Sequence, residues 1–315
     1  MPDTLQIFGK TFSNATGIVA TDNTDTERTF IRPTGTKTID ENGTYDVSEY
    51  ASAEVSVSSG GDEPIPEDGK TRIFIHIAEE TPDNCLTFYL WFQTSKDNNT
   101  TVDWGDGTVE TLGKTTGANC KHRYSKSGDY IITMTVNTGT ISFIGTSSLY
   151  SIYGARTNSL YYLRPRIKRI IFGNDVKDID SYACAYCYSL SSVKLPDSVT
   201  SIGANAFYHC YSIILVTIPD GVTSIGQSAF GNCYGITAMT VPNSVTSIGA
   251  NAFSNCRSMF EYHFKSTTPP TLENKNAFNS IDPDCIIYVP QGSLSAYQQA
   301  TNWSNYASYM QEEPT

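Results

Sequence analysis

The sequence is poor in charged residues, and especially in basic ones. Only 17% of its 315 residues are Asp, Glu, Lys or Arg, and 21 basic against 32 acidic side chains leave a formal net charge of −11. Nucleic acids and anionic membrane surfaces bind proteins that carry a basic patch. Apolar stretches are also short, and none approaches the roughly 18 residues that cross a bilayer. We therefore expect neither nucleic-acid binding nor membrane insertion.

The first ten residues, MPDTLQIFGK, lack a basic stretch followed by an apolar one. Taken as the native start, they predict no classical secretory signal. A protein that a bacterium displays on its own surface has to be exported. This expectation therefore bears on the choice between the functions weighed below.

Sequence motifs of catalysis and of cofactor binding are missing as well. The four histidines are His76, His122, His209 and His263, and no two of them stand at metal-ligand spacing. No Ser, His and Asp follow one another in the order of a catalytic triad within one predicted domain. Neither a phosphate-binding GxxxxGK[ST] loop nor a dinucleotide-binding fingerprint after a strand occurs. We expect no enzymatic activity, no metal and no cofactor.

The C-terminal half repeats itself every 23 residues. The consensus is LxxVxLPxxVTxIGxxAFxxCxx, and five classes of apolar position keep this register. Its columns include Ile179, Ile202, Ile225 and Ile248, and also Cys187, Cys210, Cys233 and Cys256. One copy is too short to bury enough apolar surface by itself, so neighbouring copies must stack. The repeat therefore predicts a stacked array and not a globular enzyme core.

Three pieces of structure are expected in each copy. The VxLP segment alternates apolar and polar residues and ends at a proline, which is typical of a short strand. The VTxIG segment predicts a second extended piece. In the AFxxC segment, small and apolar residues lie three or four positions apart, which favours a single helical turn.

Two surfaces of such an array are candidates for binding. On the strands, residues that flank the inward positions point outward, and from them we select Lys194, Thr217, Thr240, His263 and Tyr288. A second column follows each Cys and consists of Tyr188, Tyr211, Tyr234 and Arg257. These tyrosines either present an aromatic ridge to a sugar or a protein, or merely cover the convex edge of the array. The sequence leaves both interpretations open.

The repeats resemble a known family. Residues 199–207 and residues 245–253 both read VTSIGANAF, and TPPTL, AF, IYVP, AY and Trp303 follow in this order. In these features residues 164–311 resemble BspA-like leucine-rich repeats with the closing unit of that family. The resemblance implies a solenoid of short strands and single helical turns, with residues 138–163 as a connector or N-terminal cap. Members are mostly binding modules and surface adhesins, so it implies recognition rather than chemistry.

The cysteine column predicts buried thiols and no disulfides. Column neighbours lie about 5 Å apart, within the range of Cα distances for a disulfide, but parallel side chains spoil the required dihedral angle. Cys184 and Cys187 form a CxxC pair without a second pair, which is weak evidence for zinc. We interpret these residues as reduced, small hydrophobic side chains.

Residues 71–137 contain three strand patterns, at 72–77, 86–92 and 130–136. Between them lies WGDGT at 104–108, whose Asp-Gly pair predicts a hairpin, and HRY and GDY follow downstream. These motifs resemble the PKD (polycystic kidney disease) domain, an immunoglobulin-like β-sandwich that usually acts as a spacer or weak binder. In this motif the aspartate caps a turn and His122 packs beside it, so we do not assign Asp103 and Asp106 to a metal or to catalysis. Whether Cys85 and Cys120 form a disulfide stays open.

Residues 1–59 are rich in Thr, Asn and Asp, with strand patterns at 28–31 and 53–57. Residues 60–70 contain a Gly-Gly pair and a Pro-Ile-Pro segment and predict a flexible linker. Residues 35–47 with 50–55 resemble a module that recurs in structural proteins of tailed phages and prophages. The resemblance implies that residues 1–59 anchor the chain to other virion proteins. The whole chain is predicted to be mainly β and multidomain.

These observations favour a virion protein of the tail or receptor-binding type, located on a phage or prophage particle. Its solenoid binds a glycan or a protein on a bacterial surface. The first alternative is an adhesin of the bacterial cell surface. The second is a structural scaffold of the virion that binds no ligand.

Overall fold

The computed structural model describes residues 4–7, 10–14, 17–21, 27–31, 56–58, 66–77, 87–94, 100–112, 118–136, 140–143 and 167–314. They belong to two compact units, Met1–Glu67 and Asp68–Thr315. Among the described residues, no helix combines the length and the apolar character needed to cross a membrane.

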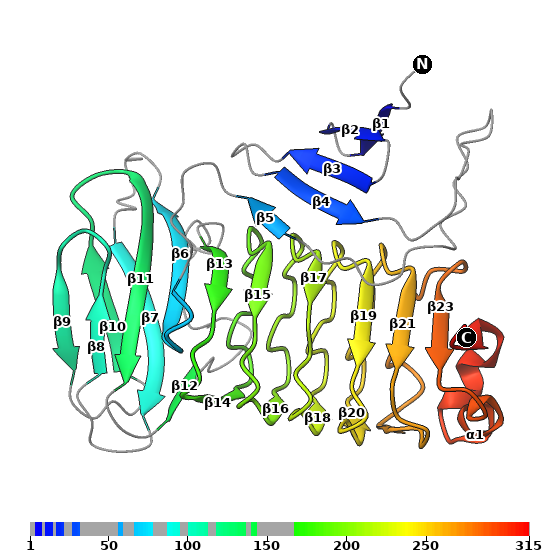
Figure 1. Ribbon diagram of the computed structural model, residues 1–315. Coiled ribbons are helices and arrows are strands. Elements are labelled where there is room, and N and C mark those ends of the chain that lie inside the picture. Colours follow the sequence, from blue (N-terminus) through cyan, green and yellow to red (C-terminus); the bar gives the residue numbers. More distant parts are fainter. Residues whose placement is uncertain are drawn as a thin grey trace. The chain divides into compact units, whose positions relative to one another are not determined.

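The first unit contains a five-stranded antiparallel sheet in which strands adjacent in sequence pair with one another (Figure 1). Its strands are β1 (Thr4–Ile7), β2 (Lys10–Asn14), β3 (Gly17–Thr21), β4 (Glu27–Ile31) and β5 (Ser56–Ser58). The predicted strand at 28–31 lies within β4. Residues 35–55, which carry the resemblance to phage proteins, lie outside the described residues.

The second unit begins with a β-sandwich. Its strands are β6 (Thr71–Ile77), β7 (Thr87–Thr94), β8 (Thr100–Asp103), β9 (Val109–Leu112), β10 (Ala118–Arg123), β11 (Gly128–Val136) and β12 (Ile141–Phe143). One layer runs β6-β11-β8-β9 and the other β10-β7-β12, all with antiparallel pairing. Buried residues alternate along β6, at Ile73, Ile75 and Ile77, because alternate side chains face the opposite layer.

A solenoid follows, and it carries two ladders of parallel strands (Figure 1). The first ladder contains β13 (Ile167–Ile171), β15 (Ser192–Lys194), β17 (Leu215–Val216), β19 (Ala238–Val241), β21 (Glu261–Phe264), β23 (Ile286–Val289) and β24 (Met310–Glu312). The second contains β14 (Val176–Ile179), β16 (Ser201–Ile202), β18 (Ser224–Ile225), β20 (Ser247–Ile248) and β22 (Thr271–Leu272). The predicted mainly β solenoid is therefore present.

The register of the repeat is confirmed by the second ladder. Ile179 pairs with Ile202, Ile202 with Ile225, and Ile225 with Ile248. All four side chains are almost completely buried. The glycine that follows Ile202, Ile225 and Ile248 has a steric role, because a Cβ on Gly226 would lie 2.5 Å from the backbone nitrogen of Ala204. Successive coils approach so closely there that only glycine fits.

The first ladder is not one continuous sheet. It is divided between two sheets, one that ends at β17 and one that begins at β19. Across this junction the N–H of Thr237 donates to the carbonyl oxygen of Ile214 at 3.4 Å, near the upper limit for a hydrogen bond. Since β17 is only two residues long, it offers little backbone for regular pairing.

The prediction of a single helical turn in each repeat is wrong. The AFxxC segment is instead a run of overlapping turns, in which the N–H of Ala206 donates to Gly203 and that of Cys210 to Phe207. The turns contain left-handed residues, among them Asn205, Asn232, Asn251 and Asn255, with φ between 56° and 59°. Asparagine tolerates this conformation better than most residues do, so its recurrence was a sign of turns.

Besides the two strand ladders, the turns connect successive coils through a third series of backbone hydrogen bonds. The N–H of Cys184 donates to the carbonyl of Ala206 at 2.7 Å, that of Phe207 to Ala229 at 2.8 Å, and that of Phe230 to Ala252 at 2.8 Å. Within the described residues one α-helix is present, α1 (Leu294–Gln299), and the 3₁₀ helix η3 (Trp303–Tyr309) follows it. Both lie in the terminal coil.

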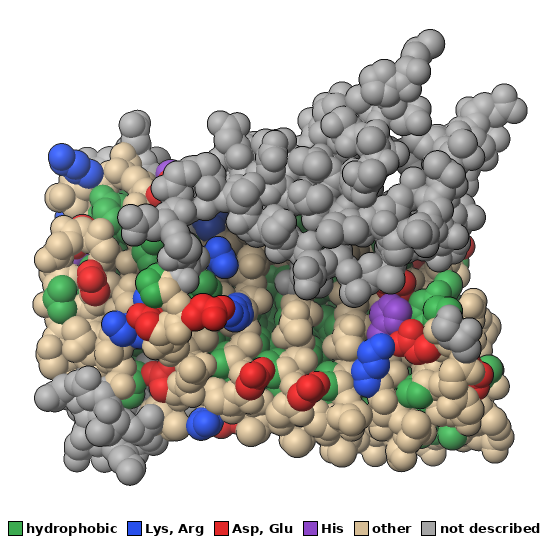
Figure 2. All heavy atoms as spheres, viewed as in Figure 1, with side chains coloured by type: hydrophobic (Ala, Val, Ile, Leu, Met, Phe, Trp, Pro, Cys, Tyr) green, Lys and Arg blue, Asp and Glu red, His purple; other side chains and the backbone are tan. Residues whose placement is uncertain are grey.

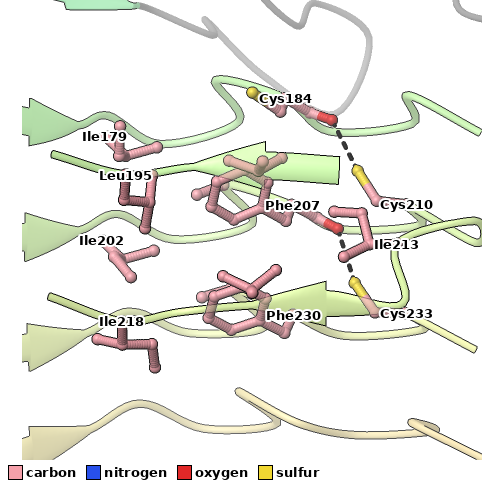
Figure 3. Packing of buried hydrophobic residues seen from close by; sticks show 14 of the residues in the cluster. Ile179, Cys184, Leu195, Ile202, Phe207, Cys210, Ile213, Ile218, Phe230 and Cys233 are labelled. Atoms are coloured by element: carbon pink, nitrogen blue, oxygen red, sulfur yellow. Dashed lines mark hydrogen bonds between the residues drawn. The ribbon is translucent and has the colours of Figure 1, made fainter. Parts of the chain in front are cut away.

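The core of the solenoid consists of stacked side chains from successive coils (Figure 3). Phe207 and Phe230 stack with centroids 5.3 Å apart, and Phe230 and Phe253 do so at 5.8 Å. Beside them the thiol of Cys210 donates to the carbonyl of Cys184 at 3.0 Å, and that of Cys233 to Phe207 at 3.1 Å.

The cysteines of the column are buried and free, as the sequence predicted. Burial raises the pKa of the Cys233 thiol, so the group stays protonated and neutral. Cys120 of the sandwich is also buried and free, and Cys85 lies outside the described residues.

The sandwich and the solenoid share both of their sheets. Strand β13 pairs with β6 in an antiparallel manner, through Ile170 with Ile73 and Ile171 with Arg72. On the other layer β12 pairs with β7 and also with β14, the first strand of the second ladder. The sandwich therefore covers the backbone edge that the first coil of the solenoid presents.

The opposite end is closed by the terminal coil. The indole N–H of Trp303 donates to the carbonyl of Pro270 at 2.7 Å, and the Asn302 side chain donates to Leu272 at 2.9 Å. These bonds satisfy carbonyl groups beside and within β22, the last strand of its sheet. Both ends of the array are thus capped, as a stacked repeat requires.

Candidate ligand-binding surfaces

The strand face carries five of the nine predicted binding residues. Lys194, Thr217 and Thr240 are exposed, whereas His263 and Tyr288 are half-buried. They alternate with the buried residues Val193, Val216, Met239, Tyr262 and Ile287. The alternation follows from the two-residue period of a strand, and the predicted outward positions are confirmed.

His263 and Tyr288 belong to a charged cluster near the C-terminus. The two rings stack with centroids 4.9 Å apart. His263 Nε2 lies 3.3 Å from Glu261 Oε1, and its Nδ1 lies 3.0 Å from Glu313 Oε1. Lys265 Nζ lies 2.7 Å from the same oxygen of Glu313. Figure 2 shows histidine, acidic and basic side chains gathered over β21 and β23.

The electrostatics of this cluster favour a protonated imidazole. Burial by itself disfavours the charged form of His263, but hydrogen bonds to Glu261 and Glu313 outweigh it and raise the pKa of the imidazole above 6.5. For Glu313 burial also opposes ionisation, and Lys265 and His263 outweigh it and lower the pKa of the carboxyl group. Glu313 directly follows β24, and its carboxylate contacts His263 of β21 and Lys265 just after it. The cluster therefore holds the segment after β24 against β21.

The predicted tyrosine column is a stack of parallel rings. Tyr188 and Tyr211 have centroids 5.0 Å apart with an interplanar angle of 19°, and Tyr211 and Tyr234 are 4.8 Å apart at 2°. The guanidinium of Arg257 lies 5.5 Å from the centroid of Tyr234, as a cation–π contact that extends the column. The structure thus brings together all four residues of this column.

Three further aromatic residues beside this column were missed by the sequence analysis. Tyr186 and His209 stack with centroids 5.1 Å apart, and His209 Nδ1 forms a hydrogen bond of 2.6 Å with Tyr211 Oη. Tyr208 lies at 77° to His209 with centroids 4.1 Å apart, and its ring lies over Gly231. The signal was present as aromatic residues at 186, 208 and 209, where later copies carry Gly, Ser or Asn.

The WGDGT motif of the sandwich forms a hydrogen-bonded turn. Asp103 accepts the N–H of Gly105 at 2.9 Å, and Asp106 accepts that of Thr108 at 3.0 Å. His122 stacks on Trp104 with centroids 4.9 Å apart and binds Asp106 at 2.7 Å. Burial opposes ionisation of Asp106, but the hydrogen bonds from His122 and Thr108 together outweigh it and lower the pKa of the carboxyl group.

In the part of the chain that the structure describes, no three or more His, Cys, Asp or Glu side chains gather as metal ligands. His209 and His263 belong to the two surfaces above, and His122 supports the turn. His76 contacts Asp129 at 2.7 Å across the paired strands β6 and β11. Each described histidine therefore has a neighbour that accounts for its position.

Comparison with known families agrees with the geometry of the repeats. A model described as BspA type leucine rich repeat region matches residues 156–282 in six copies. Residues 156–282 are a BspA-type leucine-rich repeat region. Among curated proteins, none matches the chain.

Several solved structures are similar to parts of the chain. A leucine-rich repeat protein of T. pallidum is 24% identical with a TM-score of 0.33, over 39% of this chain and 59% of that one. One from Bacteroides ovatus ATCC 8483 is 23% identical with a TM-score of 0.38, over 61% of this chain and 46% of that one. A leucine-rich cell surface protein of Faecalibacterium prausnitzii A2-165 is 20% identical with a TM-score of 0.24, over 46% of this chain and 59% of that one. The chain thus spans less than two thirds of each.

Proposed function

We propose that this protein is a non-enzymatic recognition protein of a phage or prophage virion, of the tail or receptor-binding type. Its repeat region binds a glycan or a protein on a bacterial surface. The observation that carries this proposal is the column of stacked tyrosines that Arg257 extends. Tyr and Arg are the side chains that contribute most to recognition surfaces, and the stacked coils hold them on a rigid scaffold.

The virion location is supported by the resemblance of residues 35–55 to modules of tailed-phage proteins. In this proposal residues 1–59 bind other virion proteins, and the second unit carries the ligand-binding surface. The PKD-like assignment of residues 71–137 belongs to the same proposal. It is supported by the capped WGDGT turn and by the hydroxyl of Tyr124, which donates to the carbonyl of Trp104 at 3.0 Å.

An adhesin of the bacterial cell surface is the alternative. It is favoured by the F. prausnitzii structure, which is described as a cell surface protein. The neighbouring genes distinguish the two locations: capsid or baseplate genes support the virion, and a secretion operon supports the cell surface. A virion scaffold without a ligand is the third possibility.

Binding of the fluorescently labelled full chain to a panel of bacterial cells tests the recognition itself. We expect saturable binding to some strains. Tyr211→Ala tests the tyrosine column and Lys194→Glu tests the strand face, and both variants should bind more weakly while they remain folded. No binding at high micromolar concentration would support the scaffold. Unchanged binding of both variants would exclude these two residues from the site.

A further inference from the structure

The turn side of the repeats is almost free of formal charge. Residues 181–193, 198–219 and 221–256 contain no Asp, Glu, Lys or Arg. The charged residues that interrupt them, Lys194, Asp197 and Asp220, belong to the strand segments and the loops that follow. An ionic ligand is normally recognised by side chains of opposite charge. This surface therefore fits an uncharged ligand, in contrast to the strand face with its cluster around His263.

Aromatic side chains gather on this side in the first two coils. Tyr188 and Tyr211 form one stack, Tyr186 and His209 form a second, and the bond from His209 Nδ1 to Tyr211 Oη joins them. Tyr208 stands across the second stack, at 88° to Tyr186. We call these five residues the aromatic patch. Burial lowers the pKa of His209 below 6.5, so the patch is neutral at pH 7.

Two members of the aromatic patch adopt a backbone conformation that bulky residues rarely take. Tyr186 has a φ of 63° and His209 a φ of 61°. At the matching positions of the next two coils the chain places Asn232 and Asn255, both with a φ of 59°, and asparagine accepts this conformation with less strain. Strained residues that persist in a fold are characteristic of functional sites.

We infer that the aromatic patch, Tyr186, Tyr188, Tyr208, His209 and Tyr211, binds an uncharged polysaccharide. This inference rests on the proposed function and names the ligand class and the residues. Tyrosine offers an apolar ring edge and a hydroxyl group, which match the C–H groups and the hydroxyl groups of a sugar. Tyr188, Tyr211 and Tyr234 repeat this pair of groups at intervals of 5.0 and 4.8 Å. A polymer of identical neutral units can place the same contact on each tyrosine of this evenly spaced row, whereas the surface of a folded protein does not repeat at that interval.

A double substitution tests the inference without damage to the fold. Tyr186→Asn with His209→Asn gives the first two coils the residue that the next two already carry. Relief of the strain offsets part of the aromatic contacts that the variant loses, so we expect it to stay folded, with a cooperative unfolding transition in urea. We also expect at least tenfold weaker binding to uncharged oligosaccharides. Ser228→Asn is the matched control, since Ser228 is left-handed with a φ of 51° but lies outside the aromatic patch.

The assay uses the full chain on an array of glucan, mannan and N-acetylglucosamine oligomers beside uronate, sulfated and sialylated glycans. Binding to uncharged glycans that the double variant loses and Ser228→Asn keeps supports the inference. For a glycan that binds, the NMR signal of His209 should shift, whereas those of His76, His122 and His263 should not.

Binding to acidic glycans only, or to a protease-sensitive component of cells only, would overturn the inference and leave the proposed function intact. Equal glycan binding by the double variant would place the site elsewhere on the molecule. If the unaltered chain bound neither cells nor any glycan, the proposed function itself would fail as well.

Discussion

The stacked phenylalanines of the solenoid make a quantitative prediction possible for Phe230→Ala. The Phe230 side chain is completely buried, and its ring stacks on Phe207 at 5.3 Å and on Phe253 at 5.8 Å. A buried Phe→Ala change costs about 3–5 kcal/mol through lost transfer free energy and the cavity that remains. Each aromatic pair adds about 0.5–1.5 kcal/mol beyond its buried area. Since two pairs are lost, we expect a decrease near the upper end, about 4–5 kcal/mol.

Urea unfolding followed by circular dichroism measures this decrease, and hydrogen exchange locates it. Because each coil contacts only its neighbours, amide protection should fall first in the coils around residues 207–253. The sandwich strands β6 and β11 should keep more of their protection. Phe230→Leu is the matched control: it conserves most of the buried volume but loses both aromatic pairs, so it should cost about 1–3 kcal/mol, less than Phe230→Ala. A loss below about 1 kcal/mol for Phe230→Ala would refute the stacked core.

Three further predictions each concern one side chain. Ile73→Asp places a charge between the buried Ile132 and Ile170, with which Ile73 is in register, and should destabilise the chain by several kcal/mol. Amide protection should fall in the first solenoid coils too, and an unaffected solenoid would show that the sandwich is no cap. The raised pKa of His263 means that its contribution to stability is complete below pH 6.5 and is lost as pH rises through the folded-state pKa. The thermal midpoint of His263→Gln should therefore approach that of the parent at alkaline pH, and a constant difference would contradict the ion pairs. The thiol of Cys233, buried and with a raised pKa, should react with iodoacetamide only after unfolding in urea, and mass spectrometry of native protein would reveal any earlier labelling.

The sequence by itself determined the repeat and most of its core. A 23-residue period specifies which side chains lie above one another, because a stacked array needs identical positions at each coil. This is why the isoleucine column, the buried thiols and the column of Tyr188, Tyr211 and Tyr234 could be predicted from sequence. The same logic identified the outward residues of the strand face, since strand periodicity assigns alternate side chains to opposite sides.

Local patterns failed where two conformations share one spacing. Small and apolar residues three or four apart fit a helical turn, but they also fit overlapping turns with left-handed residues. Hydrogen bonds between coils, such as that from the N–H of Phe207 to the carbonyl of Ala229, stabilise the overlapping turns rather than a helical turn. No single repeat contains these bonds. Asn205 and Asn251 were the local sign of this outcome.

Tertiary structure alone decided which segments meet. No periodicity relates the sandwich to the repeats, and yet β6 and β13 share one sheet, because the first coil exposes backbone groups that need partners. His263 and Glu313 are 50 residues apart and meet because β24 pairs with β23. Tyr186, Tyr208 and His209 became one patch with the tyrosine column only through the turns that position them. These contacts between distant segments form where other segments cover the open strand edges at the two ends of the solenoid. The repeat pattern does not specify which segments those are.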